Sequence, residues 1–117
     1  MWNLSRVAEM DLSTKKVTRW ISLLDPGNPE MAGSHPTAML LSPDEKLLFV
    51  ALSNADRVAV VSTESGAVVR LLDTWAQSQK YGGTTPSALA LSGDGKYLFV
   101  ADSSLNGVAV FDTAAIG

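Results

Sequence analysis

Four oxygen-bearing side chains stand where strand-like segments end, and they could bind a hard cation. Asn54 and Asp56 follow the apolar run 47–52, and Asp102 and Asn106 stand at the corresponding end of a second apolar run. Carboxylate and amide oxygens are the ligands that Ca²⁺ and Mg²⁺ prefer. Neither pair has the spacing of an EF-hand loop, and turn capping by Asn and Asp explains all four at least as well. The sequence therefore predicts polar turns here and assigns no metal ligand.

Acid–base or nucleophilic catalysis would have to involve His35, because it is the only histidine in the chain. Ser34 and Asp25 lie near it in the sequence, but neither lies in a nucleophile elbow or a comparable motif. The chain has no Cys, and Gly82 with Gly83 precedes a predicted strand, so no phosphate-binding loop is expected. We therefore expect no catalytic residue and no cofactor in this chain, and a turn contact for His35.

Two long connections, 24–35 and 73–85, carry the remaining candidates for function. Trp75, Lys80 and Tyr81 lie in the second connection, and an aromatic and cationic patch is a common composition of interface anchors. The alternative is that Trp75 and Tyr81 pack the connection against the end of a sheet. We expect both connections to leave the sheets on one rim, where they would face a protein or small ligand. The residues of this predicted rim are His35, Asn54, Asp56, Trp75, Lys80, Tyr81, Asp102 and Asn106.

Composition excludes several classes of function. The chain has 117 residues, with nine Lys plus Arg against twelve Asp plus Glu and a formal net charge of −3. This length fits one small domain at most, and the charge offers no basic surface for nucleic acid. Without Cys there are no disulfides and no cysteine-ligated zinc. No apolar run approaches the roughly 18 residues of a membrane span, and the first residues lack the order of a signal peptide.

An internal repeat organises the chain. Residues 36–63 align with residues 86–113 at an offset of 50, and 15 of the 28 positions are identical. A partial third copy opens the chain, because Arg6, Val7 and Ala8 align with Arg57 and its successors at an offset of 51. A fixed period of this length indicates a repeat architecture.

Each repeat contains short β-branched or aromatic runs bounded by turn residues, a pattern typical of strands. We expect nine strands, at residues 6–10, 17–23, 37–41, 47–52, 57–61, 67–72, 87–91, 97–102 and 107–111. In the run 47–52 both alternating sets of side chains are apolar, so this strand is predicted to be covered on both faces. The connections are too short for crossover helices, which makes the sheets antiparallel.

Antiparallel four-stranded sheets with both faces covered arise when sheets stack around an axis, as in a β-propeller. The predicted fold class is therefore all-β, with antiparallel four-stranded blades and about two and a quarter blades in all, a partial propeller. A β-sandwich of about nine strands would also cover apolar faces but does not require the four-strand repeat. A charge at Arg19 and Arg70 fits a half-exposed outer strand.

The repeat carries a family resemblance. Its pattern Pro-x-Ala-(apolar)₃-Ser-x-Asp-x-Lys-x-Leu-Phe-Val-Ala, followed by Val-Ala-Val-x-x-Thr, resembles the YVTN-type blade of bacterial propellers related to the lactonase family. The tetrads at 49–52 and 99–102 read Phe-Val-Ala-Leu and Phe-Val-Ala-Asp in place of Tyr-Val-Thr-Asn. Segment 81–91 is more particularly similar to the N-terminal propeller of two-domain proteins that carry a phosphoesterase domain downstream. The resemblance implies a bacterial, periplasmic or extracellular protein, and no family site residue is transferred.

We expect residues 1–23 to be the C-terminal half of a blade, 36–72 a complete blade, and 86–113 a blade lacking its outer strand. Residues 24–35 and 73–85 are then long connections between blades. A propeller needs at least about four blades, so we expect a segment of a longer protein rather than a self-assembling ring. Its expected partners are neighbouring blades, from the same chain or other subunits. The expected function is a noncatalytic recognition or scaffold module; the alternative is part of a lactonase-like enzyme whose active residues lie in other blades.

Overall fold

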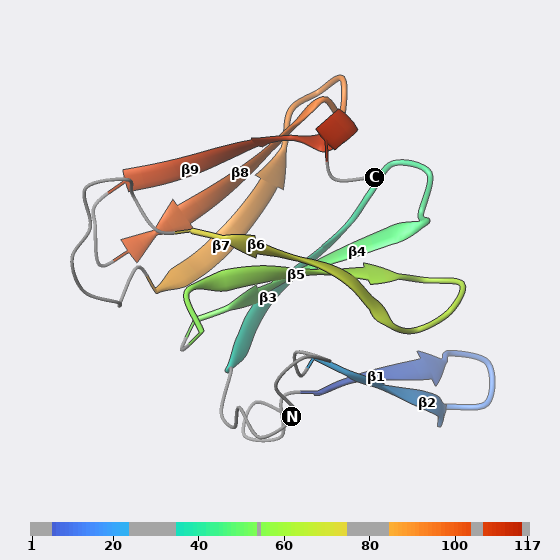
Figure 1. Ribbon diagram of the computed structural model, residues 1–117. Helices are drawn as coiled ribbons and strands as arrows, with labels where there is room; N and C mark the ends of the chain where they lie inside the picture. Colours follow the sequence, from blue (N-terminus) through green and yellow to red (C-terminus); the bar gives the residue numbers. More distant parts are fainter. Residues whose placement is uncertain (1–5, 24–34, 54, 75–84, 104–106, 116–117) are drawn as a thin grey trace.

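The computed structural model describes residues 6–23, 35–53, 55–74, 85–103 and 107–115. These residues form three separate antiparallel sheets, arranged as a fan in which each sheet lies against the next (Figure 1). We refer to them as the first, middle and last units. The first unit contains β1 (Arg6–Asp11) and β2 (Lys16–Ser22), the middle unit β3 (Pro36–Leu41), β4 (Leu47–Leu52), β5 (Arg57–Ser62) and β6 (Val68–Asp73), and the last unit β7 (Pro86–Leu91), β8 (Tyr97–Asp102) and β9 (Gly107–Asp112).

The predicted fold class is confirmed. All nine expected strands are present among the described residues, and their ends agree with the prediction to within one residue. Within each sheet the strands follow one another in chain order as a meander, and the middle unit has the predicted four strands. Three sheets stacked in series differ from the two facing sheets of a sandwich, so the propeller-type arrangement holds. A 3₁₀ turn, Thr113–Ala115, follows β9.

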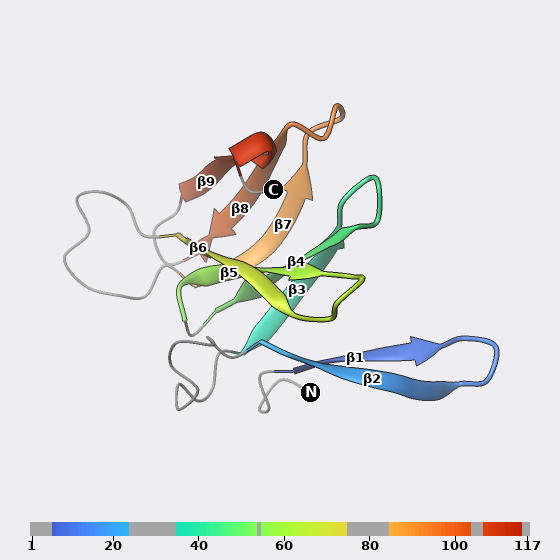
Figure 2. The same ribbon diagram turned by 45° about the vertical axis from the view of Figure 1, so that its right-hand side comes forward.

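The middle sheet lies between the other two sheets (Figure 2). Two apolar layers hold the three units together, and both involve this sheet. We call the face of a unit that looks toward the next unit its forward face, and the opposite one its backward face. The strand β4 serves both layers, because Phe49 is 1% exposed on the forward face while Val50 and Leu52 are 0% exposed on the backward face. The predicted burial of this strand on both faces is therefore confirmed.

The members of the two layers alternate along the strands, as pleated strands require. Between the middle and last units the buried residues are Phe49, Val58, Val60, Leu72, Leu98 and Val100. Between the first and middle units they are Ile21, Leu23, Val50, Leu52, Ala59 and Val61. Each layer therefore joins the forward face of one unit to the backward face of the next.

Arginines on the outer strands add a second, polar link between successive units. Arg19 of β2 donates hydrogen bonds to the backbone carbonyls of Thr63 and Glu64 in the middle unit, the latter at 3.3 Å from Nη1. Arg70 of β6 donates from Nη1 to the carbonyl of Ala115, in the last unit, at 2.7 Å. The two arginines stand 51 residues apart, at equivalent repeat positions. The sequence predicted only that an outer strand tolerates them, whereas the structure shows that they connect the units.

The contact of Arg19 depends on the shape of the turn that receives it. Gly66, in the turn between β5 and β6, has φ +68°, a conformation that other residues adopt only at a cost. A Cβ atom at this position would lie 2.7 Å from Nη1 of Arg19. The guanidinium is also held from its own sheet, because Nη2 lies 2.9 Å from Oε2 of Glu9. The turn at Gly66 and the ion pair with Glu9 together fix the direction of the Arg19 side chain.

Candidate functional site

The long connections leave the sheets on the same rim as the β4–β5 and β8–β9 turns, as predicted. The amide of Ser53, after β4, donates to the carbonyl of His35 at 3.1 Å. Fifty residues later, Ser103 donates to the carbonyl of Thr85 at 3.2 Å. The last described residue of each connection is thus bonded to the turn beside it. We call the described part of this end of the sheets the rim; it comprises His35, Ser53, Ala55, Asp56, Thr74, Thr85, Asp102 and Ser103.

His35 makes the predicted turn contact through its backbone. Its carbonyl accepts hydrogen bonds from the amide and from Oγ of Ser53, the latter at 3.2 Å. Its φ is +51°, and its counterpart Thr85 has φ +50°. Left-handed backbone is unfavourable for both residue types, most of all for a β-branched Thr. Both positions precede a strand-opening proline, and the hydrogen bonds across the rim hold them in this conformation.

Asp56 fixes both described ends of the connection between the middle and last units. Its backbone carbonyl accepts from the amide of Thr74 at 3.1 Å and from its Oγ1 at 2.8 Å. Its side-chain Oδ1 accepts from the amide of Thr85 at 3.4 Å. Asp56 is itself 8% exposed and has φ +54°, which Asp tolerates better than most residues. The sequence placed the connection 73–85 on this rim but did not single out Thr74 or Thr85 as candidate site residues.

Asp102 behaves differently, and the prediction of turn capping is wrong for this residue. It lies in β8, is 5% exposed, and follows Leu98 and Val100 on the face that is buried against the middle unit. Its Oδ1 is buried, and no described residue forms a hydrogen bond with it. Burial raises the pKa of the Asp102 carboxyl, and the negative charge of Asp56 raises it further. Its ladder partners are Gly107 in β9 and Pro86 in β7, of which Pro86 has no backbone N–H.

The structure therefore groups the predicted rim residues in a new way. Asp56 and Asp102 face one junction between two units, whereas the sequence paired each of them with an Asn of its own turn. Among the described residues no group of three or more His, Cys, Asp or Glu could hold a metal ion. The predicted rim residues that lie outside the described part of the chain are Asn54, Trp75, Lys80, Tyr81 and Asn106.

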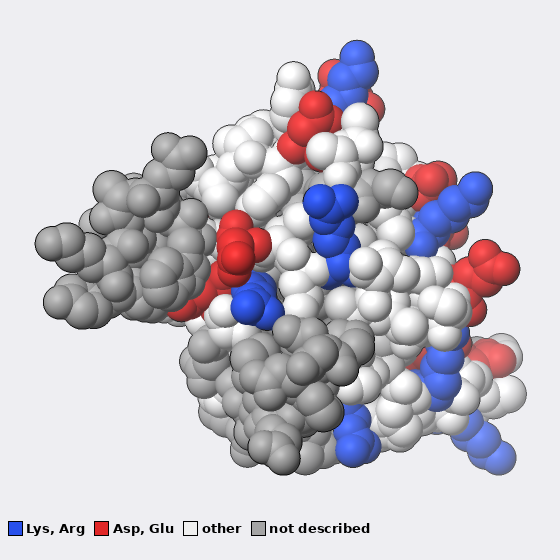
Figure 3. All heavy atoms as spheres, in the orientation of Figure 1, with Lys and Arg blue, Asp and Glu red and all other residues white. Residues whose placement is uncertain are grey.

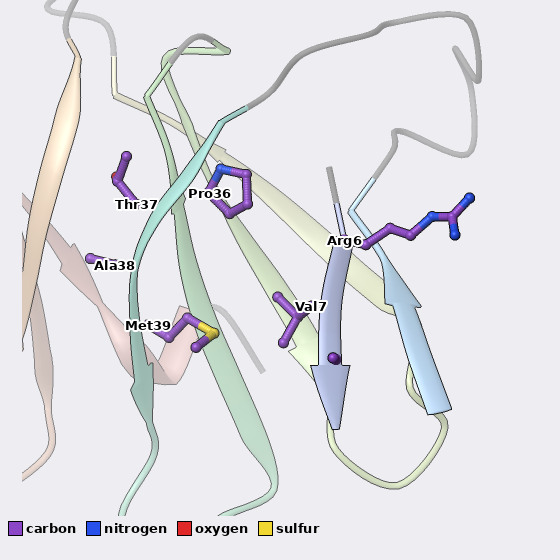
Figure 4. Close-up of a pocket in the computed structure, with 7 residues that line it drawn as sticks. Arg6, Val7, Pro36, Thr37, Ala38 and Met39 are labelled. Atoms are coloured by element: carbon purple, nitrogen blue, oxygen red, sulfur yellow. The ribbon is translucent and has the colours of Figure 1, made fainter. Parts of the chain in front are cut away.

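A separate hollow of about 350 Å³ lies between β1 and β3. Figure 4 shows Pro36 and Met39 of β3 and Val7 of β1 pointing into this space, while Arg6 points away from it. In the repeat, β5 of the middle unit is equivalent to β1. The strand β4 lies beside β5, with β3 next to it, and both β3 and β4 contact β7 of the last unit. The repeat thus places a strand where this hollow lies, so we do not interpret it as a small-molecule site.

Charged side chains of both signs are interspersed over the face shown in Figure 3, and its described part carries no extended region of one sign. In the described ranges, no helix is long and apolar enough to cross a membrane.

Comparisons with known proteins agree with the stacked sheets. The family model described as "Lactonase, 7-bladed beta-propeller" matches residues 22–117. Among solved structures, hydrazine synthase of Kuenenia stuttgartiensis is similar, with a TM-score of 0.74 and 26% sequence identity. That match covers 95% of this chain but only 27% of the hydrazine synthase chain, so the present chain spans about a quarter of its length. The comparison with curated proteins found no match.

Proposed function

Because the chain belongs to the lactonase family of seven-bladed β-propellers, we propose that its sheets act as a noncatalytic recognition and scaffold segment of a larger bacterial propeller protein. The YVTN character of the blades and a periplasmic or extracellular location are part of this proposal. The similarity to one quarter of hydrazine synthase supports it, since a segment of this size is there built into a much longer chain.

The observation that carries the scaffold role is the open forward face of the last unit. Its residues Phe99, Val108 and Val110 are 36%, 61% and 56% exposed. Fifty positions earlier, the equivalents of these three residues are 1%, 0% and 0% exposed. The same pattern of apolar side chains is thus covered on the forward face of the middle unit and exposed on the forward face of the last unit. Such a face is suited to stacking against another sheet of the same kind, so neighbouring blades are the proposed partners.

Association through this face can be tested with one charged substitution. We expect the molar mass of the wild-type chain to rise with concentration, because the open face buries apolar surface on another chain. Val110→Asp places an unpaired charge on that face, which should keep the chain monomeric. The measurement is light scattering on a sizing column. Val69→Asp is the matched control, since Val69 is also 56% exposed but lies on the outer strand β6.

A wild-type mass that remains monomeric at every concentration would contradict stacking through the open face. If Val110→Asp and Val69→Asp reduce association equally, the association does not occur through the open forward face.

We assign the recognition role to the rim, because bonds across it hold the described ends of both long connections. If Trp75 and Tyr81 contact a partner, the double variant Trp75→Ala/Tyr81→Ala should retain its strand content. Its free energy of unfolding should also stay within about 0.5 kcal/mol of wild type, as for other surface positions. Circular dichroism and thermal unfolding measure both quantities. A loss of several kcal/mol would show instead that the pair packs against the sheets.

A second candidate function is part of a lactonase-like enzyme whose active residues lie in other blades. The description of the matching family favours it. Reading the genomic sequence on both sides of this segment separates the two. Further blades with a cluster of charged residues at the central channel would favour the enzyme, whereas a downstream phosphoesterase domain would favour a propeller that serves as a recognition module.

A further inference from the structure

The buried position of Asp102 is energetically unfavourable for an ionised carboxylate. Asp102 is 95% buried, and its Oδ1 lacks a hydrogen-bond partner in the part of the chain that the structure describes. A buried charge is tolerated when it is paired or binds a cation, and a buried acceptor without a partner destabilises a protein. Within the described ranges, no group therefore compensates the burial of this oxygen.

The repeat shows that packing does not require this carboxylate. The residue equivalent to Asp102 in the middle unit is Leu52, which is 0% exposed in the apolar layer against the first unit. The fold thus fills the same position with a hydrocarbon side chain at one junction and with an ionisable one at the next. Packing between the units therefore does not explain the carboxylate at the second junction.

Asp56 supplies a second carboxylate from the opposite unit. Its Oδ1 lies 3.4 Å from the amide of Thr85. The carbonyl of Thr85 accepts from Ser103, the residue after Asp102, and Pro86 lies opposite Asp102 in the ladder. This chain of contacts brings the Asp56 carboxylate to the end of β8, where Asp102 lies. A surface hollow of about 390 Å³ lies beside Asp56 and is also bordered by Ala55, Arg57 and Asp73.

We propose that Asp56 and Asp102 bind a divalent cation, with Ca²⁺ as the preferred ion, at the junction of the middle and last units. The ligands are hard carboxylate oxygens, which excludes the softer metals that select sulfur. Ca²⁺ suits them because it accepts an irregular set of carboxylates and waters, whereas Mg²⁺ requires near-ideal octahedral geometry. Two carboxylates on separate sheets make a weak site, with an expected dissociation constant of about 0.1–1 mM. The bound ion would tie the two units together.

The test is thermal unfolding of the whole chain after removal of divalent ions, with and without 10 mM CaCl₂ at matched ionic strength. Wild type should gain about 5–10 °C in Tm from Ca²⁺, because the ion binds the folded state only. Asp102→Asn and Asp102→Leu should gain less than about 1 °C. The leucine variant reproduces Leu52, so it should fold. Asp94→Asn is the matched control, since this exposed turn aspartate should leave the gain in Tm unchanged.

Isothermal titration with CaCl₂ gives the second readout, and one ion per wild-type chain is expected. Loss of this binding in Asp102→Asn, with the folded circular dichroism spectrum retained, supports the site. Three results overturn it: no stabilisation of wild type by Ca²⁺, equal stabilisation of wild type and Asp102→Leu, or equal losses in Asp94→Asn and Asp102→Asn. In the first case a proton, rather than a metal ion, neutralises Asp102.

Discussion

Phe49→Ala should lower the free energy of unfolding by about 3–5 kcal/mol, the range for truncating a fully buried Phe. Phe49 is 1% exposed and lies at the centre of the layer between the middle and last units, where Val60 and Val100 are both fully buried. Removing the ring deletes apolar contacts with both sheets and leaves a cavity that rigid strands cannot close. The junction between these two units should therefore weaken more than the sheets themselves.

The repeat supplies a matched control for this substitution. Phe99 has the same residue type and the same strand position fifty residues later, but it is 36% exposed on the open forward face. Phe99→Ala should cost only about 1–2 kcal/mol, because part of the ring is in water and no enclosed cavity is formed. Urea unfolding of both variants, at a concentration where the chain is monomeric, gives the comparison. Equal losses for the two phenylalanines would contradict the difference in coverage between the two faces.

The second large effect is a stabilisation. In the absence of divalent cations, Asp102→Asn should raise the free energy of unfolding by about 1–2 kcal/mol at pH 7. Asn keeps the shape of the side chain but cannot ionise, so the variant removes the cost of a buried charge that faces Asp56.

The pH dependence of this difference has a definite sign. The pKa of Asp102 is raised above its ordinary 3.8, so the folded state holds this proton more tightly than the unfolded state does. Wild type therefore loses stability as the pH rises from below 3.8 through the raised pKa, and the loss is complete above it. The advantage of Asp102→Asn should be absent near pH 3 and should grow as the pH rises above 3.8 through the raised pKa.

Denaturant unfolding at a series of pH values measures the difference between the two proteins. Taking the difference matters, because hydrogen bonds lower the pKa of Glu9, Asp11, Asp44 and Asp94. These four groups make both proteins less stable in acid, and their effects cancel. A stability difference that is constant from pH 3 to pH 7 would mean that the charge of Asp102 is not the cause.

Most of the fold could be predicted because the same pattern of strands and turns occurs in successive repeats. Alignment at an offset of 50 identifies the strands twice, and turn residues mark their ends, which is why all nine agree with the structure to within one residue. The two apolar faces of residues 47–52 follow from simple alternation. The placement of both long connections on one rim followed from the alternating direction of antiparallel strands, and the bonds of His35 and Thr85 confirm it.

The contacts between units could not be predicted from the sequence. Whether Arg19 or Arg70 reaches a carbonyl of the next sheet depends on how the sheets are offset, which no pattern within a strand encodes. The approach of Asp56 to Asp102 likewise arises only when two units stack. The sequence held one signal of the unusual position of Asp102. Its equivalent in the preceding repeat is the apolar Leu52, which lies in a strand predicted to be covered on both faces. Such a departure at a buried repeat position marks a residue that packing alone does not explain.

The arginine links also bear on the curvature of the whole assembly. The hydrophobic contacts of an apolar layer are not directional, so by themselves they specify the angle between two sheets only through the shapes of the side chains. Hydrogen bonds from Arg19 and Arg70 to fixed carbonyls are directional, and they act at the outer circumference, where a small rotation moves atoms furthest. They would therefore set the angular step between one sheet and the next. In a closed ring that step determines how many blades complete the circle.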